Sequence, residues 1–278
     1  MIILSHFQAK NILGMYVKKA ESCEVSLDLG ISLSKVSFSD GKVIFPDKQE
    51  IQIDDIKKIA ETNKVCFAVE ENTIKKIHLF SEDTNRFYKL LPTGFNTAPT
   101  VEISGIRMHA VKGISPLADA KQKVDSIKPF SGMVLDTCTG LGYTAILSSE
   151  SGEVYTHEKD KNMVIMEKYN PWSERLFSSK NIHAERKSII EKIPDYKDGF
   201  FDRIMHDPPS FKIASELYML DFYKELFRVL KKEGKLYHYI GNPDGKKGVN
   251  IERGVLKRLE KCGFRFAKRA AKGVVVVK

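Results

Sequence analysis

The chain has 278 residues, a hydrophobic content of 42% and a formal net charge of +9. It is long enough for one large domain or for two, with a substantial buried core. No apolar run is long enough to cross a bilayer, and the N-terminus lacks a secretory signal pattern. The cysteines are isolated and form no CxxC pair, which argues against a zinc site and a disulfide framework. We therefore expect a cytoplasmic protein with no membrane association and no metal.

The positive charge is unevenly distributed along the chain. Residues 1–110 contain 14 Lys and Arg against 14 Asp and Glu, whereas residues 231–278 contain 14 against 4. A basic cluster confined to one part of a fold favours a polyanionic partner. A solvated, lysine-rich surface that promotes solubility explains the same composition, and charge alone does not separate the two interpretations.

Residues 1–105 are predicted to form a small α+β domain. The pattern Ile53, Ile56, Ile59 and Ala60 predicts a helix over residues 53–62, and residues 39–42 have the composition of a hairpin turn. Strands are expected at residues 24–27, 36–38, 43–45, 65–69, 74–80 and 87–91. This part of the chain carries no catalytic motif. Capture of a substrate and plain packing against a second domain both remain open as its role.

Turn-forming residues at 91–99 mark the boundary to a second domain, which we expect to span residues 106–278. The segment 104–123 approaches this domain and carries Arg107, His109, Lys112 and Asp119. A linker followed by an N-terminal helix is the simpler interpretation of this segment. The alternative is a segment that covers a ligand pocket, with Arg107 and His109 as the best candidates for substrate contacts.

Strands and helices alternate from residue 131 onward, which predicts a doubly wound α/β domain. Residues 217–230 form a strongly amphipathic helix pattern with Gly234 beyond its end. A helix at 251–262 is expected to have Asn250 as its N-cap and Gly263 as its stop. The remaining elements are expected helices at 143–149 and 161–169, and expected strands at 133–135, 153–157, 182–185, 201–205, 235–240, 264–266 and 274–277.

The stretch MVLDTCTGLGYT at residues 133–144 has the pattern of a nucleotide-binding element. Large apolar residues predict a short buried strand that ends at Asp136, and Gly140 and Gly142 follow in a tight turn before a helix opens at Tyr143. Glycine lets the backbone approach a ligand closely, and the free N–H groups of a helix N-terminus favour electron-rich oxygens. Glu158 stands at the carboxyl end of the next strand, where an acid can accept both ribose hydroxyls of a nucleoside. The alternative is a solvated acid within Glu158-Lys159-Asp160.

The fourth strand of this domain ends in FDRIMHDPPSF at residues 201–211. Proline favours extended geometry in the residue before it and offers a carbonyl without a competing N–H group. Asp207 with Pro208 and Pro209 therefore presents a carboxylate and fixed acceptors that could hold the hydrogens of an exocyclic amine, and Phe211 could stack on a flat substrate. The alternative is a strand-ending turn with Phe211 in the core.

These motifs together resemble class I S-adenosylmethionine-dependent methyltransferases. The combination DTCTGLGYTA, NPWS at Asn170–Ser173, HDPP, the ELY…FY…L helix and HYIGNP is most similar to uncharacterised archaeal predicted methyltransferases, and the resemblance covers about residues 105–278. It implies a seven-stranded Rossmann-like sheet and S-adenosylmethionine as cofactor. It also implies that Asp136, Gly140 and Gly142 line the methionine and ribose side of the cofactor. Glu158 would then hold the ribose, and Asp207-Pro208-Pro209 would face the transferred methyl group.

The predicted site follows from these motifs. The catalytic candidates are Asp207, Pro208, Pro209 and Phe211. The cofactor candidates are Asp136, Thr137, Cys138, Gly140, Gly142, Tyr143, Thr144, Glu158, Lys159 and Asp207, and the substrate candidates are Arg107, His109, His206, Ser210 and His238. Two positions depart from the family pattern: Cys138 stands where the first glycine is usual, and Glu185-Arg186-Lys187-Ser188 stands where an Asp often contacts adenine.

The sequence favours N-methylation of an exocyclic amine of a base in RNA. Asp207 and the Pro208 carbonyl would orient the amine, and His206 or His238 either takes the proton or is a structural histidine. A carbon-5 pyrimidine mechanism needs a cysteine nucleophile, and none lies near residues 206–211 in the sequence. The alternatives are methyl or aminopropyl transfer to a small amine, methyl transfer to a protein side chain, and a non-catalytic RNA-binding module.

Overall fold

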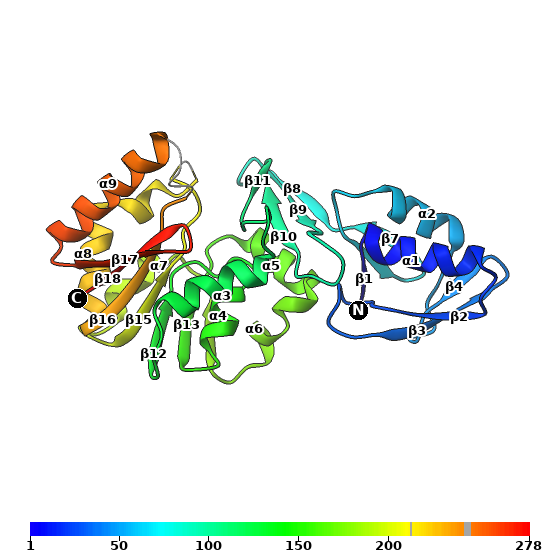
Figure 1. The fold of residues 1–278 in the computed structure, drawn as a ribbon, viewed down its shortest axis with the longest axis horizontal. Coiled ribbons are helices and arrows are strands. Elements are labelled where there is room, and N and C mark those ends of the chain that lie inside the picture. Colours follow the sequence, from blue (N-terminus) through cyan, green and yellow to red (C-terminus); the bar gives the residue numbers. More distant parts are fainter. Residues whose placement is uncertain (212, 242–245) are drawn as a thin grey trace. The chain divides into compact units, whose positions relative to one another are not determined.

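The computed structural model describes residues 1–211, 213–241 and 246–278, and the side chains of residues 246–250 lie outside this description. The described chain divides into two compact units, whose elements are labelled in Figure 1. The first comprises Met1–Leu117 and Asn162–Glu174, and the second comprises Ala118–Lys161 and Arg175–Lys278. The first unit therefore extends past the expected boundary at residues 105–106 and ends at Leu117. It also includes a segment from the middle of the chain.

The first unit is built from short antiparallel sheets and two long helices. Its sheets have the strand orders β1-β6-β7, β2-β3-β4-β5 and β11-β10-β9-β8. The strands are β1 (Ile2–Leu4), β2 (Ser22–Val25), β3 (Ser34–Ser39), β4 (Lys42–Ile44), β5 (Glu50–Gln52), β6 (Phe67–Glu70), β7 (Thr73–Lys76), β8 (His78–Ser81), β9 (Arg86–Leu91), β10 (Thr100–Ile103) and β11 (Ile106–Arg107). The expected strand at 74–80 is in fact β7 and β8 in two different sheets, joined at the buried Ile77.

Helix α1 (His6–Val17) was not predicted from the sequence, whereas α2 (Ile53–Glu61) was. Ser5 caps α1 with a capping box: its Oγ accepts the Phe7 N–H at 3.2 Å, and Gln8 Oε1 accepts the Ser5 N–H at 3.1 Å. Ala9 and Ile12 of α1 share a core with Ile56 and Ile59 of α2. The spacing Ser-x-x-Gln was the signal for this helix start.

The middle segment of the first unit contains most of α5 (Lys161–Tyr169) and the short helix η1 (Pro171–Ser173). Asn162 Nδ2 donates to Ser81 Oγ at 3.2 Å, and Trp172 Nε1 donates to the Leu29 carbonyl at 3.3 Å. Asn170 caps η1 through the Trp172 N–H. The NPWS motif therefore serves to hold this segment within the first unit.

The described residues of the second unit contain a seven-stranded sheet of order β14-β13-β12-β15-β16-β18-β17. β18 runs antiparallel to both of its neighbours, β16 and β17. From β14 to β16 in the sheet order, every pair of neighbouring strands is parallel. The strands are β12 (Met133–Asp136), β13 (Glu153–His157), β14 (Ile182–Glu185), β15 (Phe201–His206), β16 (Leu230–Tyr239), β17 (Arg265–Ala270) and β18 (Gly273–Val277). The predicted doubly wound α/β fold is confirmed.

Helices cover both faces of this sheet because consecutive strand residues point to opposite sides. Leu135, Ile204 and Leu236 face the core formed with α8 and α9, whereas Met205, Tyr237 and Val275 face α3. The helices are α3 (Pro116–Ser126), α4 (Tyr143–Ser148), α6 (Arg175–Ser178), α7 (Ile189–Lys192), η2 (Ile193–Asp195), η3 (Ser215–Tyr218), α8 (Leu220–Val229) and α9 (Lys246–Lys261).

Several boundaries differ from those expected. The helix at 217–230 is divided, because the Leu217 carbonyl accepts a hydrogen bond from His206 Nε2 at 3.0 Å and Met219 is extended. β16 begins at Leu230 rather than at 235. α9 begins at Lys246, so Asn250 lies within the helix and is not its N-cap. The side chain of Asn250 lies outside the described residues, as do residues 242 and 243 of the HYIGNP motif.

No helix in the described part of the chain is both long and apolar enough to cross a membrane. The same residues bring together no group of three or more His, Cys, Asp or Glu side chains that could hold a metal ion.

Candidate functional site

The loops after β12, β13 and β15 meet at the carboxyl edge of the sheet. These strands are neighbours and parallel, so their carboxyl ends lie side by side. The Thr137 N–H donates to the Met205 carbonyl at 3.0 Å, and the Thr139 N–H donates to the His157 carbonyl at 2.9 Å. The sheet therefore brings Asp136, Glu158 and Asp207 to one edge of one unit.

The glycines of the turn after β12 have different structural requirements. Both have left-handed backbone geometry, with φ of +56° at Gly140 and +79° at Gly142. A Cβ at Gly142 would overlap the side chain of Leu176, whereas a Cβ at Gly140 would meet no atom within 4 Å. Gly142 is therefore required for packing of the turn, while the backbone at Gly140 borders open space in which a ligand can approach.

Asp136 is fully buried at the end of β12. Its Oδ2 accepts the Thr144 hydroxyl at 2.9 Å, and its Oδ1 has no hydrogen-bond partner among the described residues. Burial raises the pKa of Asp136 to about 7, and the nearby charge of Asp207 adds to the rise. A buried oxygen without a partner is costly, so this side chain is suited to receive a donor from a ligand.

Glu158 closes over the glycine turn. Its carboxylate accepts the Gly140 N–H at 3.0 Å and the Asp160 N–H at 2.9 Å. Burial raises the pKa of Glu158 to about 7, and these two hydrogen bonds oppose the rise. Lys159 points elsewhere, since its Nζ lies 2.6 Å from Glu216 Oε1 in η3.

Asp207 is ion-paired with a lysine that the sequence did not single out. Lys123 Nζ on α3 lies 2.7 Å from Asp207 Oδ2 and 2.9 Å from Asp119 Oδ2, and its side chain is 3% exposed. Burial alone would lower the pKa of Lys123, but the two carboxylates outweigh burial and raise it. Burial raises the pKa of Asp207, and Lys123 offsets part of that rise. The motif thus presents a carboxylate held by a buried cation.

His206 and His238 have structural partners on both ring nitrogens. His206 Nδ1 lies 2.8 Å from Thr137 Oγ1, and its Nε2 lies 3.0 Å from the Leu217 carbonyl. His238 Nε2 lies 2.6 Å from the Tyr223 hydroxyl, and its Nδ1 lies 2.7 Å from the Tyr239 carbonyl. Burial lowers the pKa of His206 well below its usual range and that of His238 to about 3. Of the two roles considered, this geometry favours structural histidines.

The residues after Asp207 pass from the buried Pro208 to the exposed Ser210 and Phe211. The Pro209 carbonyl accepts the Tyr218 hydroxyl at 2.9 Å, whereas the Pro208 carbonyl has no donor among the described residues. Ser210 is exposed, and Phe211 is 48% exposed with its ring 5.5 Å from that of Tyr218. Phe211 is therefore not a core residue and is available to contact a flat substrate.

Cys138 lies closer to this loop than its sequence position indicated, because its thiol interacts electrostatically with Asp207. Burial raises the pKa of the Cys138 thiol well above its usual range, so the thiolate is disfavoured. A cysteine-nucleophile mechanism, which the sequence disfavours, therefore remains disfavoured.

No family model matches the chain. The chain is, however, 43% identical over 241 residues to the uncharacterised protein MJ1233 of Methanocaldococcus jannaschii, which covers 84% of this chain and 80% of that protein. The chain belongs to the family of MJ1233.

Solved structures are similar to this chain in fold. A spermidine synthase in complex with the transition-state analogue AdoDATO matches 76% of this chain and 78% of its own, with a TM-score of 0.55 and 14% identity. The spermidine synthase of Thermotoga maritima matches 76% and 77% with a TM-score of 0.50 and 14% identity. MNMC2 of Aquifex aeolicus matches 70% of each chain with a TM-score of 0.50 and 16% identity. The chain therefore has the fold of S-adenosylmethionine-dependent methyl- and aminopropyltransferases.

Two predicted substrate residues lie in the first unit. Arg107 is exposed on β11, with its Nε 3.8 Å from Glu102 Oε2, and His109 Nδ1 lies 2.9 Å from Thr100 Oγ1. Their contact with a substrate stays a prediction. Asp119, by contrast, belongs to the second unit and joins the Asp207 cluster through Lys123.

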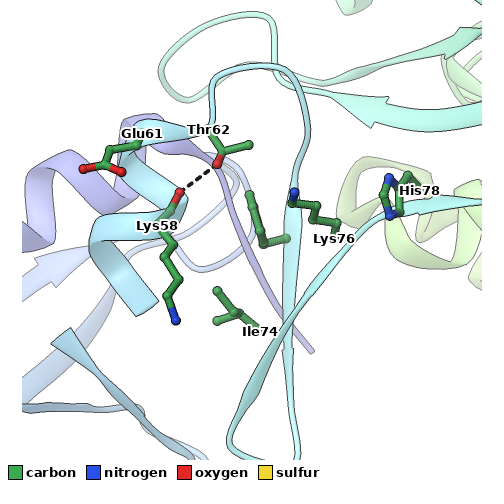
Figure 2. A pocket seen from close by; sticks show the side chains of 7 residues that line it. Lys58, Glu61, Thr62, Ile74, Lys76 and His78 are labelled. Carbon is green, nitrogen blue, oxygen red and sulfur yellow. Dashed lines mark hydrogen bonds between the residues drawn. The ribbon is translucent and has the colours of Figure 1, made fainter. Parts of the chain in front are cut away.

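The first unit also has a hollow of about 530 Å³ between the end of α2 and strands β6 to β8. Figure 2 shows Lys58, Lys76 and His78 around it, with the Thr62 hydroxyl donating to the Lys58 carbonyl at 2.8 Å. None of the residues predicted to bind cofactor or substrate lines this hollow.

Proposed function

We propose that this protein is an S-adenosylmethionine-dependent methyltransferase that acts on an amine nitrogen, with an exocyclic amine of an RNA base as the acceptor. One observation carries the proposal: the glycine turn, Glu158 and Asp207 share the carboxyl edge of one sheet, and Asp207 is a partly exposed carboxylate that is ion-paired with the buried Lys123. Ligands of doubly wound α/β folds bind at this edge.

The residues at this edge fit the cofactor. The backbone at Gly140 borders open space, and Glu158 is a carboxylate that two ribose hydroxyls can approach. Asp136 Oδ1 is a buried acceptor without a donor among the described residues. When bound, the cofactor supplies an activated methyl group on its sulfonium, so the protein must orient the acceptor rather than generate a strong nucleophile.

Asp207 and the Pro208 carbonyl would each accept an N–H of the amine and direct its lone pair at the methyl carbon. As the nitrogen–carbon bond forms, the nitrogen becomes positive, and the Asp207 carboxylate stabilises that charge and takes the released proton. Lys123 favours the ionised form of Asp207 and so opposes the effect of burial on its pKa. His206 and His238 take no part, because their ring nitrogens are used within the fold.

Aminopropyl transfer to a small amine is the second candidate. It is favoured by the fold similarity to spermidine synthase and by Asp119, which gives the cluster a second carboxylate beside Lys123. The cluster formed by Asp119, Lys123 and Asp207 carries two negative charges against one positive charge, which suits a cationic amine.

The proposal is tested by offering the purified protein cofactor that is tritiated in its methyl group together with RNA, protein and metabolite fractions of a cell extract. We expect label in the RNA fraction. Label only in the metabolite fraction would overturn the RNA acceptor. Turnover of decarboxylated cofactor with a diamine, and no methyl transfer to any fraction, would replace methyl by aminopropyl transfer.

A further inference from the structure

The turn between β17 and β18 lies at the same sheet edge as Asp207. In the parallel pair β15–β16, His206 is opposite His238, and in the antiparallel pair β16–β18, Tyr239 is opposite Gly273. The end of β17, the turn and the start of β18 are therefore level with the end of β15. The Tyr237 hydroxyl fixes the turn by donating to the Ala271 carbonyl at 2.7 Å.

A short series of contacts joins this turn to the proposed catalytic carboxylate. Lys123 Nζ, which lies 2.7 Å from Asp207, also lies 4.9 Å from the centroid of the Tyr239 ring. Tyr239 pairs with Gly273, and it packs with Ala271 in the core around Tyr237. The turn is thus linked through Tyr239 to the cluster formed by Lys123 and Asp207.

The end of β17 and the turn after it carry basic side chains, two of which have no acidic partner among the described residues. Lys268 and Lys272 are exposed and form no ion pair with any residue that the structure describes. Arg269 Nε lies 2.6 Å from Glu252 Oε1, so its charge is partly balanced. Charges without local partners at a sheet edge attract a polyanion from solution.

We propose that Lys268 near the end of β17 and Lys272 in the β17–β18 turn contact phosphates of a single-stranded RNA acceptor and position its base at Asp207. The inference rests on the proposed function and adds the surface that recognises the acceptor. Phosphate contacts fix the register of a nucleic acid without reading its sequence. A free small amine carries no phosphate, so these lysines would not contribute to its binding. A requirement for the two lysines would therefore distinguish an RNA acceptor from a small amine.

The test compares two double variants that remove equal charge. K268A/K272A removes the lysines near the end of β17 and in the turn. K232A/K261A removes exposed lysines toward the opposite edge, where Arg265 at the start of β17 pairs with Glu233 of β16. The probe is a fluorescein-labelled single-stranded RNA of mixed sequence, and its affinity is measured by fluorescence polarisation at about 50 to 200 mM KCl. Cofactor binding is measured in parallel by calorimetry.

For K268A/K272A we expect roughly tenfold weaker RNA binding at low salt and a salt slope shallower by about 1.4, the value for two lost single-strand phosphate contacts. The K232A/K261A variant is expected to bind like the wild type. Equal losses in both variants, or no loss in the first, would overturn the inference. If the wild-type protein binds RNA but not the cofactor, the proposed function is overturned. The RNA affinities of the two double variants still decide the role of the turn.

Discussion

Asp207→Asn is expected to lower methyl transfer by about 10²- to 10³-fold, the cost typical of removing one preorganised electrostatic group. Asparagine keeps the shape of the side chain but cannot stabilise a positive nitrogen or take its proton. Affinity for the cofactor should change little, because Glu158 and the Gly140 backbone would carry the ribose contacts. Transfer is measured with methyl-tritiated cofactor and RNA, and binding by calorimetry.

Asp119→Asn is the control for this variant. It also removes one negative charge next to Lys123, but in our account Asp119 acts only through that lysine. It should therefore retain most of the transfer activity. Similar losses in both variants would mean that the charge of the cluster matters and not the position of Asp207, and full activity of Asp207→Asn would remove its catalytic role.

Lys123→Met is expected to lower the free energy of unfolding by about 3–5 kcal/mol near neutral pH, since it leaves two buried carboxylates without their counter-charge. The loss should be smaller in acid. Burial already raises the folded-state pKa of Asp207, and without Lys123 it rises further above the unfolded value near 4. A carboxyl group whose pKa is raised in the folded state lowers the free energy of unfolding as the pH rises above about 4. Urea unfolding at about pH 5 and about pH 8 measures the difference.

Lys121→Met makes the same substitution on the same helix at an exposed site. Lys121 pairs with Asp125 at 2.6 Å, and such surface pairs contribute about 0–1 kcal/mol. In addition, Lys123→Met/Asp207→Asn should recover part of the stability, because it removes one of the unpaired charges. An equal loss for Lys123→Met at both pH values would indicate lost packing and not lost charge compensation.

The sequence was sufficient to predict the sheet and the three acids at its edge. Asp136, Glu158 and Asp207 each come just after a predicted strand, and neighbouring parallel strands bring such positions to one edge of the sheet. The same reasoning could not find Lys123. A lysine in a mixed helix normally faces solvent, and its partner Asp207 lies far along the chain, so only the packing of α3 on the sheet pairs them.

Other differences have similar causes. Cys138 is near Asp207 only because β12 and β15 are adjacent, although many residues separate them in sequence. His206 and His238 had suitable positions for catalysis, but sequence cannot show that Thr137, Leu217 and Tyr223 use their nitrogens. Contacts such as that of Trp172 with Leu29 likewise place a segment of the predicted second domain in the first unit.

The proposed function requires that S-adenosylmethionine binds at Gly140 and Glu158, and calorimetry measures this binding directly. The pKa of Glu158 is raised to about 7, and only its ionised form accepts two ribose hydroxyls. Affinity should therefore rise several-fold, up to about tenfold, between about pH 6 and about pH 8, as the competent fraction grows.

In Glu158→Gln, the affinity should fall by roughly 10- to 100-fold, the loss expected for hydrogen bonds to a charged group. The pH dependence of cofactor affinity in this variant should also weaken, because only the titration of Asp136 remains to contribute to it. Glu153→Gln, at the start of the same strand, should bind like the wild type. Binding of the cofactor that is equally tight in wild type and Glu158→Gln, or no binding to the wild type at saturating concentration, would contradict the account.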